Sequence, residues 1–387
     1  MPVDDATLAV RLGFVPPSVA GPDAARPGLL RAGPRAAAPY ARDAVDVHEC
    51  RATDTCRPGT RPPDLLEHGF AVVDLSPLDD LQAACARVRA AGSVTDDDAG
   101  TIRSALHGAV LRGAGGREVT VLFLAEEGFI MRTAGPDGMA VVGPRSQGMN
   151  GHGGATSVHS DQDVFGTPLT QLMDGRAPSL FRHDSPDGHN HDAGLMLVNL
   201  WIPLQQITQP LVLADGRSID RRRHQLRYGL ATDSFLDRED DMAVNDIWTY
   251  LHDPGQRWYL RSEMDHREAY LFDTLSTPHG AGTLPGEDVA ARCHRALEAA
   301  EADVAGGAIA ALVDAVEPAR RAQAPPDTPR PLVEAVEAMA AVADEAGRDP
   351  AHVCGDGAEA WLDRSRRARQ RVVRMSLEMR VVVSLDA

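Results

Sequence analysis

The most constraining feature of this sequence is a succession of short, strand-like segments separated by turns rich in glycine, proline and aspartate. These segments begin near residue 68 and continue to residue 275, and a further one spans residues 374–385. Their β-branched and aliphatic residues alternate with polar ones or run together, as is typical of buried strands. Many short strands joined by such turns favour an antiparallel double sheet. We therefore predict a mainly β fold with a jelly-roll (double-stranded β-helix, cupin-like) core.

Two stretches of the chain differ from this pattern. Residues 1–65 are rich in proline and alanine and predict an arm that lies over a core. Residues 286–370 are rich in alanine and glutamate, with apolar residues three and four apart, which predicts helices. The expected organisation is an N-terminal arm over 1–65, a jelly-roll domain over 66–285 plus 371–387 that carries the functional site, and an α-helical insert over 286–370 before the last strand.

Charge and composition exclude several function classes. The formal net charge of −17 argues against nucleic acid or an anionic membrane as a partner. The chain has no lysine, so all 39 basic residues are arginine. Schiff-base chemistry, pyridoxal-phosphate catalysis and Walker-type phosphate loops each need a lysine and are excluded. Any anionic ligand must therefore be held by arginine, histidine or backbone amides.

The cysteines and the apolar segments indicate the compartment. The five cysteines are an odd number without Cys-x-x-Cys spacing, which favours a reducing environment over a disulfide scaffold. No apolar run approaches the roughly 18 residues of a membrane helix, and the first residues lack a basic region followed by an apolar one. We expect a cytoplasmic protein without a membrane partner.

A histidine and an aspartate two residues apart, His159 and Asp161, form the first candidate site. On a strand these two side chains project to the same face, where an imidazole and a carboxylate supply two of the three protein ligands of a non-haem Fe(II) site. His279, in a turn flanked by proline and glycine just after a strand-like segment, is the candidate third ligand. A second histidine with an acidic residue two positions on, His266 with Glu268, falls at a turn and is expected to be structural.

The last predicted strand carries alternating polar residues. Arg374 and Ser376 share one face of it, where a guanidinium and a hydroxyl suit the binding of a carboxylate. Further along the same face, Glu378 and Arg380 are expected to form a structural ion pair. Asn199 and Trp201, on the predicted strand over 194–204, are expected to line a substrate pocket.

Taken together, these motifs resemble the Fe(II)/2-oxoglutarate-dependent oxygenases. The segments "NLWIPL", "QPLVLAD", "QRWYLRSEMDHREAYLFDTLSTPHGA" and "RMSLEMRVVV" are similar to the branch that contains cephamycin 7α-hydroxylase and the gibberellin-desaturase-like oxidases. The resemblance covers roughly residues 155–285 plus 371–387. It leaves the arm and the helical insert outside.

The resemblance implies a set of roles. His159, Asp161 and His279 would bind Fe(II), and Arg374 with Ser376 would bind the distal carboxylate of 2-oxoglutarate, with O2 as the second cosubstrate. The expected activity is hydroxylation or desaturation of a small molecule, such as an amino acid or a natural-product intermediate. Halogenation is disfavoured, because Asp161 occupies the position that related halogenases leave to a halide.

Several alternatives stay open at the level of sequence. In the oxygenase family the arginine usually follows the distal histidine closely, so Arg292 or Arg295 competes with Arg374 for that role. A pterin in place of 2-oxoglutarate, a non-redox cupin-like isomerase or hydrolase, and a degenerate jelly-roll binding protein fit the same residues. The cluster of His183, His189 and His191 reads as a loop, with metal binding as its alternative. The helical insert is the expected surface for any homo-oligomer.

Overall fold

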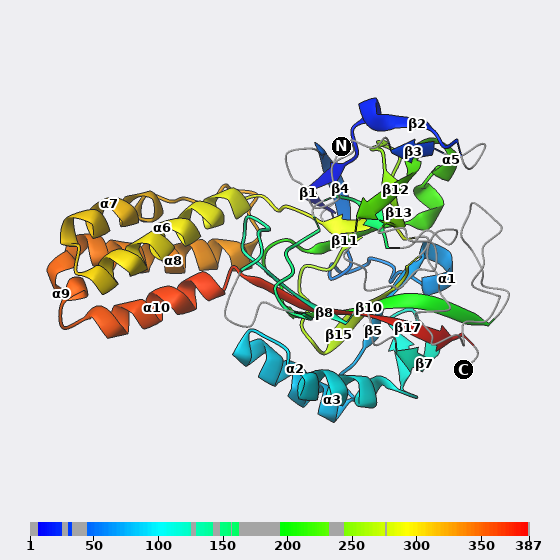
Figure 1. Cartoon of the computed structure of the whole chain (residues 1–387), viewed down its shortest axis with the longest axis horizontal. Coiled ribbons are helices and arrows are strands. Elements are labelled where there is room, and N and C mark those ends of the chain that lie inside the picture. Colours follow the sequence, from blue (N-terminus) through cyan, green and yellow to red (C-terminus); the bar gives the residue numbers. More distant parts are fainter. Residues whose placement is uncertain are drawn as a thin grey trace.

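A computed structural model describes residues 7–24, 30–32, 45–124, 129–141, 148–155, 157–161, 194–231, 244–274 and 277–385. Two β-sheets face each other, and a bundle of helices extends from one side of them (Figure 1). None of the helices in these ranges is long and apolar enough to cross a membrane.

The larger sheet, sheet A, has ten strands in the order β1-β4-β14-β11-β16-β9-β13-β12-β3-β2. The strands of sheet A are β1 (Thr7–Phe14), β2 (Ala20–Pro22), β3 (Leu30–Ala32), β4 (Asp46–Asp54), β9 (His159–Ser160), β11 (Leu211–Ala214), β12 (Gln225–Ala231), β13 (Val244–Tyr250), β14 (Trp258–Leu260) and β16 (His279–Ala281). The proline- and alanine-rich segment over 1–65 supplies β1 to β4, which lie at both edges of this sheet.

The smaller sheet, sheet B, has seven strands in the order β10-β15-β5-β6-β7-β17-β8, and β10 also pairs with β17. The strands of sheet B are β5 (Phe70–Asp74), β6 (Val110–Gly113), β7 (Glu118–Leu124), β8 (Ile130–Ala134), β10 (Leu195–Gln205), β15 (Glu268–Asp273) and β17 (Arg374–Ser384). Strand β17 pairs antiparallel with β10 along one side and with β8 and β7 along the other. The strand predicted to come last therefore lies in the middle of the sheet.

The chain crosses between the sheets in the manner of a jelly roll. In sequence order β8 is in sheet B, β9 in A, β10 in B, β11 and β14 in A, β15 in B, β16 in A and β17 in B. This arrangement gives the core orders β8-β17-β10-β15 and β9-β16-β11-β14. The double-sheet jelly roll predicted from the turn-separated strands is thus confirmed.

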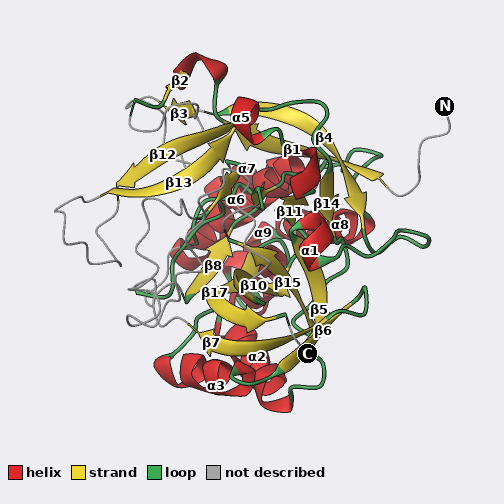
Figure 2. Cartoon of the chain, turned by 90° about the vertical axis from the view of Figure 1, so that its right-hand side faces the viewer, coloured by secondary structure: helices red, strands yellow, loops and turns green. Residues whose placement is uncertain are grey.

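Each face of sheet B has its own core. Apolar side chains of β17 such as Leu377 and Met379 pack with those of α2 (Asp79–Ala91) and α3 (Asp96–Leu106), which cover the outer face of the sheet (Figure 2). The inner face packs against sheet A through Phe70, Trp201 and Phe272 among others. Because side chains alternate along a strand, Arg374, Ser376 and Glu378 face inward between the sheets.

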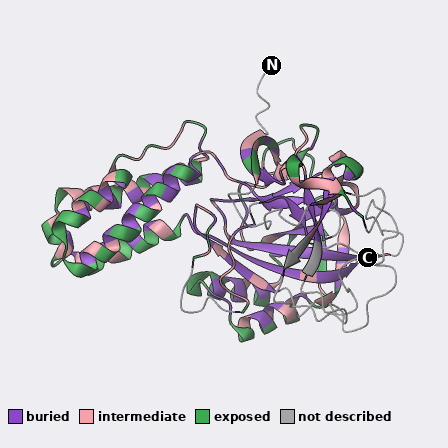
Figure 3. Cartoon of the chain, turned by 45° about the horizontal axis from the view of Figure 1, so that its top comes forward, coloured by how far each residue is buried: buried purple, intermediate pink, exposed green. Residues whose placement is uncertain are grey.

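The helices between β16 and β17 form a bundle. They are α6 (Glu287–Gly306), α7 (Ile309–Arg320), α8 (Arg330–Arg348), α9 (Pro350–Cys354) and α10 (Ala358–Gln370). Their inward faces share one apolar cluster, centred on residues such as Leu297, Met339 and Trp361, while the outward faces are exposed (Figure 3). The predicted helical insert before the last strand is confirmed as part of the fold.

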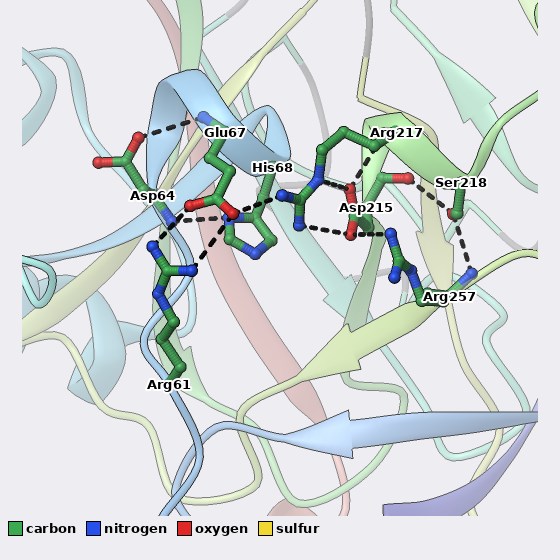
Figure 4. A network of polar contacts seen from close by, with 8 residues as sticks. All are labelled: Arg61, Asp64, Glu67, His68, Asp215, Arg217, Ser218 and Arg257. Atoms are coloured by element: carbon green, nitrogen blue, oxygen red, sulfur yellow. Dashed lines mark hydrogen bonds and ion pairs between the residues drawn. The ribbon is translucent and has the colours of Figure 1, made fainter.

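Two short helices, α1 (Leu65–His68) and α5 (Arg221–His224), and the 3-10 turns η1 (Pro17–Val19) and η5 (Gly216–Ser218) complete the described elements. A polar network joins α1 to η5 (Figure 4). Arg217 contacts both Glu67 and the buried Asp215, and Arg257 lies 2.9 Å from the same aspartate. Ion pairs between exposed side chains contribute little to the free energy of unfolding. Within this network, the contacts of the buried Asp215 therefore contribute most to stability.

Candidate metal centre

His159, Asp161 and His279 come together between the two sheets. His159 is the first residue of β9 and His279 is the first residue of β16. These strands are neighbours, and the two histidines stand directly opposite each other in the antiparallel register. Asp161 follows β9 two residues after His159, on the same face, as the spacing predicts. Pairing of two short strands thus assembles residues that are far apart in the sequence.

The spacing of their donor atoms fits one metal ion. A ligand atom from each residue lies within 4.8 Å of the other two. Nε2 of His159 is 3.7 Å from one carboxylate oxygen of Asp161, and Nε2 of His279 is 3.7 Å from the other. Ligands about 2.1 Å from a metal lie about 3 to 3.4 Å apart when adjacent, so a small contraction closes the site.

Both histidines are held in the orientation that a metal ligand needs. Nδ1 of His159 is 2.8 Å from the carbonyl oxygen of Ser157, and Nδ1 of His279 is 2.9 Å from that of Thr277. A ring N–H that donates to a carbonyl fixes the tautomer and leaves Nε2 with its lone pair. In both residues that nitrogen is directed towards Asp161.

The protonation states also suit a cation. Burial, reinforced by His279, lowers the pKa of His159 to about 4, so its imidazole is neutral at pH 7. Burial on its own would raise the pKa of Asp161, but His279 and then Arg380 outweigh it and the pKa is lowered. A neutral imidazole and an ionised carboxylate are the forms that bind a metal.

The two histidines line a cavity between the sheets, and Arg374 lies in the wall of that cavity. Arg374 is 2% exposed, and its Nε and Nη1 atoms have no hydrogen-bond partner among the described residues; the same holds for Oγ of Ser376. Burial, together with nearby Arg132, lowers the pKa of Arg374 to about 9, which keeps the guanidinium charged at pH 7. A buried cation with unused donors is costly unless an anion completes it. The donor set therefore fits a carboxylate.

The cavity runs from the two histidines to Arg374. It is narrow, with a cavity volume of about 10 Å³. Its lining comprises Arg132, Ala155, His159, Trp201, Leu211, Phe272, His279, Gly280, Ala281, Arg374 and Glu378. Trp201 is in the wall, and its ring lies 5.3 Å from the Arg374 guanidinium carbon. Asn199 is not in this lining; its Nδ2 donates instead to Oδ2 of Asp161.

One pair of residues in the cavity differs from the sequence-based expectation. Glu378 pairs with Arg132 of β8, Nε to Oε2 at 2.9 Å, and not with Arg380. Arg132 and Glu378 are 246 positions apart and both are largely buried. Arg132 stands in no recognisable motif, so only the β8–β17 pairing reveals it.

The other candidate arginines lie elsewhere. Arg292 and Arg295 are on α6 with half or more of each side chain exposed, and they pair with Asp288 and Asp137. In the pair of His266 and Glu268, the glutamate forms an ion pair with Arg261 at 2.6 Å, and neither residue is in the cavity lining. His183, His189 and His191 lie outside the described residues.

Comparison with known proteins gives a distant likeness in structure. No family model matches the chain, and no curated protein matches it. Among solved structures it is similar to the iron and alpha-ketoglutarate-dependent endoperoxidase NvfI, with 14% identity, a TM-score of 0.44 and 98% of each chain covered. A single-residue variant of that protein gives 15% identity, a TM-score of 0.46 and 99% of each chain. Since a likeness this distant carries no functional conclusion, the function of this chain has to be inferred from the donor atoms gathered between β9, β16 and β17.

Proposed function

We propose that this chain is an Fe(II)- and 2-oxoglutarate-dependent oxygenase that hydroxylates or desaturates a small molecule. The observation that carries this proposal is the arrangement around one cavity: His159, His279 and Arg374 line it, and Asp161 lies beside the two histidines. His159, Asp161 and His279 offer three ligand atoms to a metal, and Arg374 offers unpartnered buried donors to an anion. A metal next to a carboxylate-binding arginine is what a chelating keto acid requires.

Each residue has a role that follows from its surroundings. The two histidines and Asp161 would occupy three coordination positions of Fe(II) and leave the others open. When bound, Fe(II) with 2-oxoglutarate and O2 supplies oxidation of an unactivated C–H bond, with release of succinate and CO2. Arg374 and Ser376 would hold the distal carboxylate of the keto acid, and Trp201 packs against the guanidinium and limits its motion.

The choice of Arg374 over its competitors is supported by burial. A carboxylate that approaches Arg292 or Arg295 meets an exposed side chain with an acidic partner already in place. Arg374 instead has free donors in a site from which water is largely excluded, where a charge-assisted hydrogen bond is stronger. The sequence distance of 95 positions from His279 is taken up by the helices α6 to α10.

The proposal extends to the organisation of the chain. We propose a unit over 66–285 plus 371–387 that holds the site, an N-terminal segment over 1–65, and a helical unit over 286–370 whose separate apolar cluster supports this division. We also propose a small-molecule substrate, a cytoplasmic location, and the outer faces of α6 to α10 as the surface for any homo-oligomer.

Anaerobic titration tests the metal and the keto acid together. Addition of Fe(II) and then 2-oxoglutarate to the wild-type protein is expected to give a weak visible charge-transfer band. Asp161→Ala and His279→Ala each remove one of the three ligands and should abolish the band. Absence of the band and of succinate formation in the wild type would favour a non-redox metal enzyme, and failure to retain any metal would favour a binding protein.

A further inference from the structure

Asn199 connects the candidate metal ligands to the opposite sheet. It lies in β10 of sheet B, on the inward face that it shares with Trp201, and is fully buried. Its Nδ2 atom donates a hydrogen bond to Oδ2 of Asp161, which follows β9 of sheet A. The bond therefore spans the gap between the two sheets at the level of the site.

The three ligand residues are held in two different ways. Each histidine ring is fixed within sheet A by the carbonyl oxygen of the residue two positions before it. Asp161 is fixed from sheet B: its backbone N–H donates to the carbonyl oxygen of Thr274, just after β15, and its carboxylate accepts from Asn199. The position of this one ligand thus depends on how the sheets are docked.

The contact also restricts how the carboxylate can bind. The amide N–H engages Oδ2, which lies 3.7 Å from Nε2 of His279, while Oδ1 lies 3.7 Å from Nε2 of His159. A carboxylate that rotates freely about its Cβ–Cγ bond would lose this placement of one oxygen beside each imidazole. The hydrogen bond from the buried amide restricts that rotation and keeps the carboxylate directed towards the two imidazoles.

We propose that Asn199 is a positioning residue that holds the Asp161 carboxylate in the orientation in which it would bind the metal. This inference rests on the proposed metal-dependent function. Partners that orient metal ligands typically contribute a factor of about 10 to 100 to metal affinity. Loss of the Asn199 donor should therefore weaken metal binding by about that factor without removal of any ligand.

The test compares Asn199→Leu, which keeps a similar volume without the donor, with Thr208→Val as a matched control. Thr208 is also buried and follows the same strand, but its hydroxyl donates to the carbonyl oxygen of Val372, away from Asp161. Co(II) affinity is measured by calorimetry, and the Co(II) ligand-field spectrum is recorded for each protein. Asn199→Ser serves as a second variant if the leucine substitution prevents folding, which the melting temperature of the metal-free protein reports.

We expect Co(II) to bind Asn199→Leu about 10- to 100-fold more weakly than the wild type, with a changed ligand-field spectrum, and Thr208→Val within about twofold of the wild type. Wild-type affinity and spectrum in Asn199→Leu, or in Asn199→Ser, would overturn the inference and leave the proposed function standing. A wild-type protein that binds no Co(II) or Fe(II) would overturn both.

Discussion

Arg374 is a fully buried cation whose Nε and Nη1 atoms meet no acceptor among the described residues. Desolvation of a guanidinium costs several kcal/mol, and only a hydrogen-bonded anion offsets that cost well. Glu378, a carboxylate on the same face of β17, is already paired with Arg132. The free donors of Arg374 are therefore left for a ligand from solution.

Replacement of Arg374 by methionine, which has a similar reach and no charge, should raise the apparent KM for 2-oxoglutarate by about 10²-fold or more. The reason is the loss of a buried charge-assisted contact, for which a cost of about 3 kcal/mol is typical. The measurement is succinate formation as a function of 2-oxoglutarate concentration. Arg292→Ala is the matched control and should change that KM less than twofold, because its side chain is exposed on α6. The reverse ranking would reject Arg374 as the cosubstrate ligand.

The sequence predicts the residues whose pattern is local. His159 and Asp161 share a strand face by spacing alone, and Arg374 and Ser376 do the same on β17. Asn199 and Arg132 carry no such pattern, since each acquires its partner only when strands from distant parts of the chain pair or face each other. Sequence periodicity predicts which side chains share one face of a strand. It does not predict which residue of a distant strand lies opposite them.

At the scale of elements, a short segment after β10 fastens the helical bundle to the sheets. Gln205 donates to the carbonyl oxygens of Gln370, at the end of α10, and Val373, just before β17, and Thr208 donates to that of Val372. Gln209, whose φ of 50° is the one positive value at a non-glycine residue in the described chain, donates its N–H to Glu287 at the start of α6. Residues 205–209 thus hold both ends of the insert, next to the strand that carries Arg374.

Glu287→Ala should destabilise the protein by about 2 to 4 kcal/mol, because it leaves two buried N–H groups without an acceptor. These are the N–H groups of Gln209 and Leu284, 2.7 and 3.0 Å from Oε1 of the fully buried Glu287. The midpoint of urea unfolding reports the change. Glu337→Ala, at an exposed position of α8, is the control and should shift stability by less than about 0.5 kcal/mol. Equal effects of the two substitutions would show that the contact does not fasten the bundle.

The helices were predictable because alanine-rich segments with apolar residues three and four apart repeat over the insert. The strands β1 and β4 were not anticipated within the proline- and alanine-rich segment, although they pair over eight residues of each strand. Their stability comes from tertiary packing of residues such as Leu12 and Ala52 with side chains from other strands of sheet A, which overrides the local composition.

At the scale of the whole molecule, several histidines are kept neutral by the fold. Burial lowers the pKa of His68, His252, His266 and His294 below their ordinary value. As the pH falls below about 6.5, the unfolded chain takes up protons that the folded protein does not. The free energy of unfolding therefore decreases over that range.

The metal-free protein should accordingly have a lower melting temperature at pH 5.5 than at pH 7.5. The acidic groups whose pKa is lowered, such as Asp64 and Asp215, lose their contribution only below about pH 4 and do not act in this range. His68→Gln should reduce the difference, because Nδ1 of His68 accepts a hydrogen bond from the Asp64 N–H and protonation would break it. A melting temperature that is flat between these pH values, in wild type and variant alike, would contradict this account.

Strand β17 follows every other element of the fold in the chain, yet it lies in the middle of sheet B with β10 on one side and β7 and β8 on the other. During synthesis β8, β10 and the whole helical bundle are therefore made before the strand that pairs with both β8 and β10. Arg374, the first residue of β17, takes its place in the cavity wall only when β17 has paired with them. Sheet B and the cavity wall that carries Arg374 are consequently completed together, so a chain that stops within the bundle would lack both.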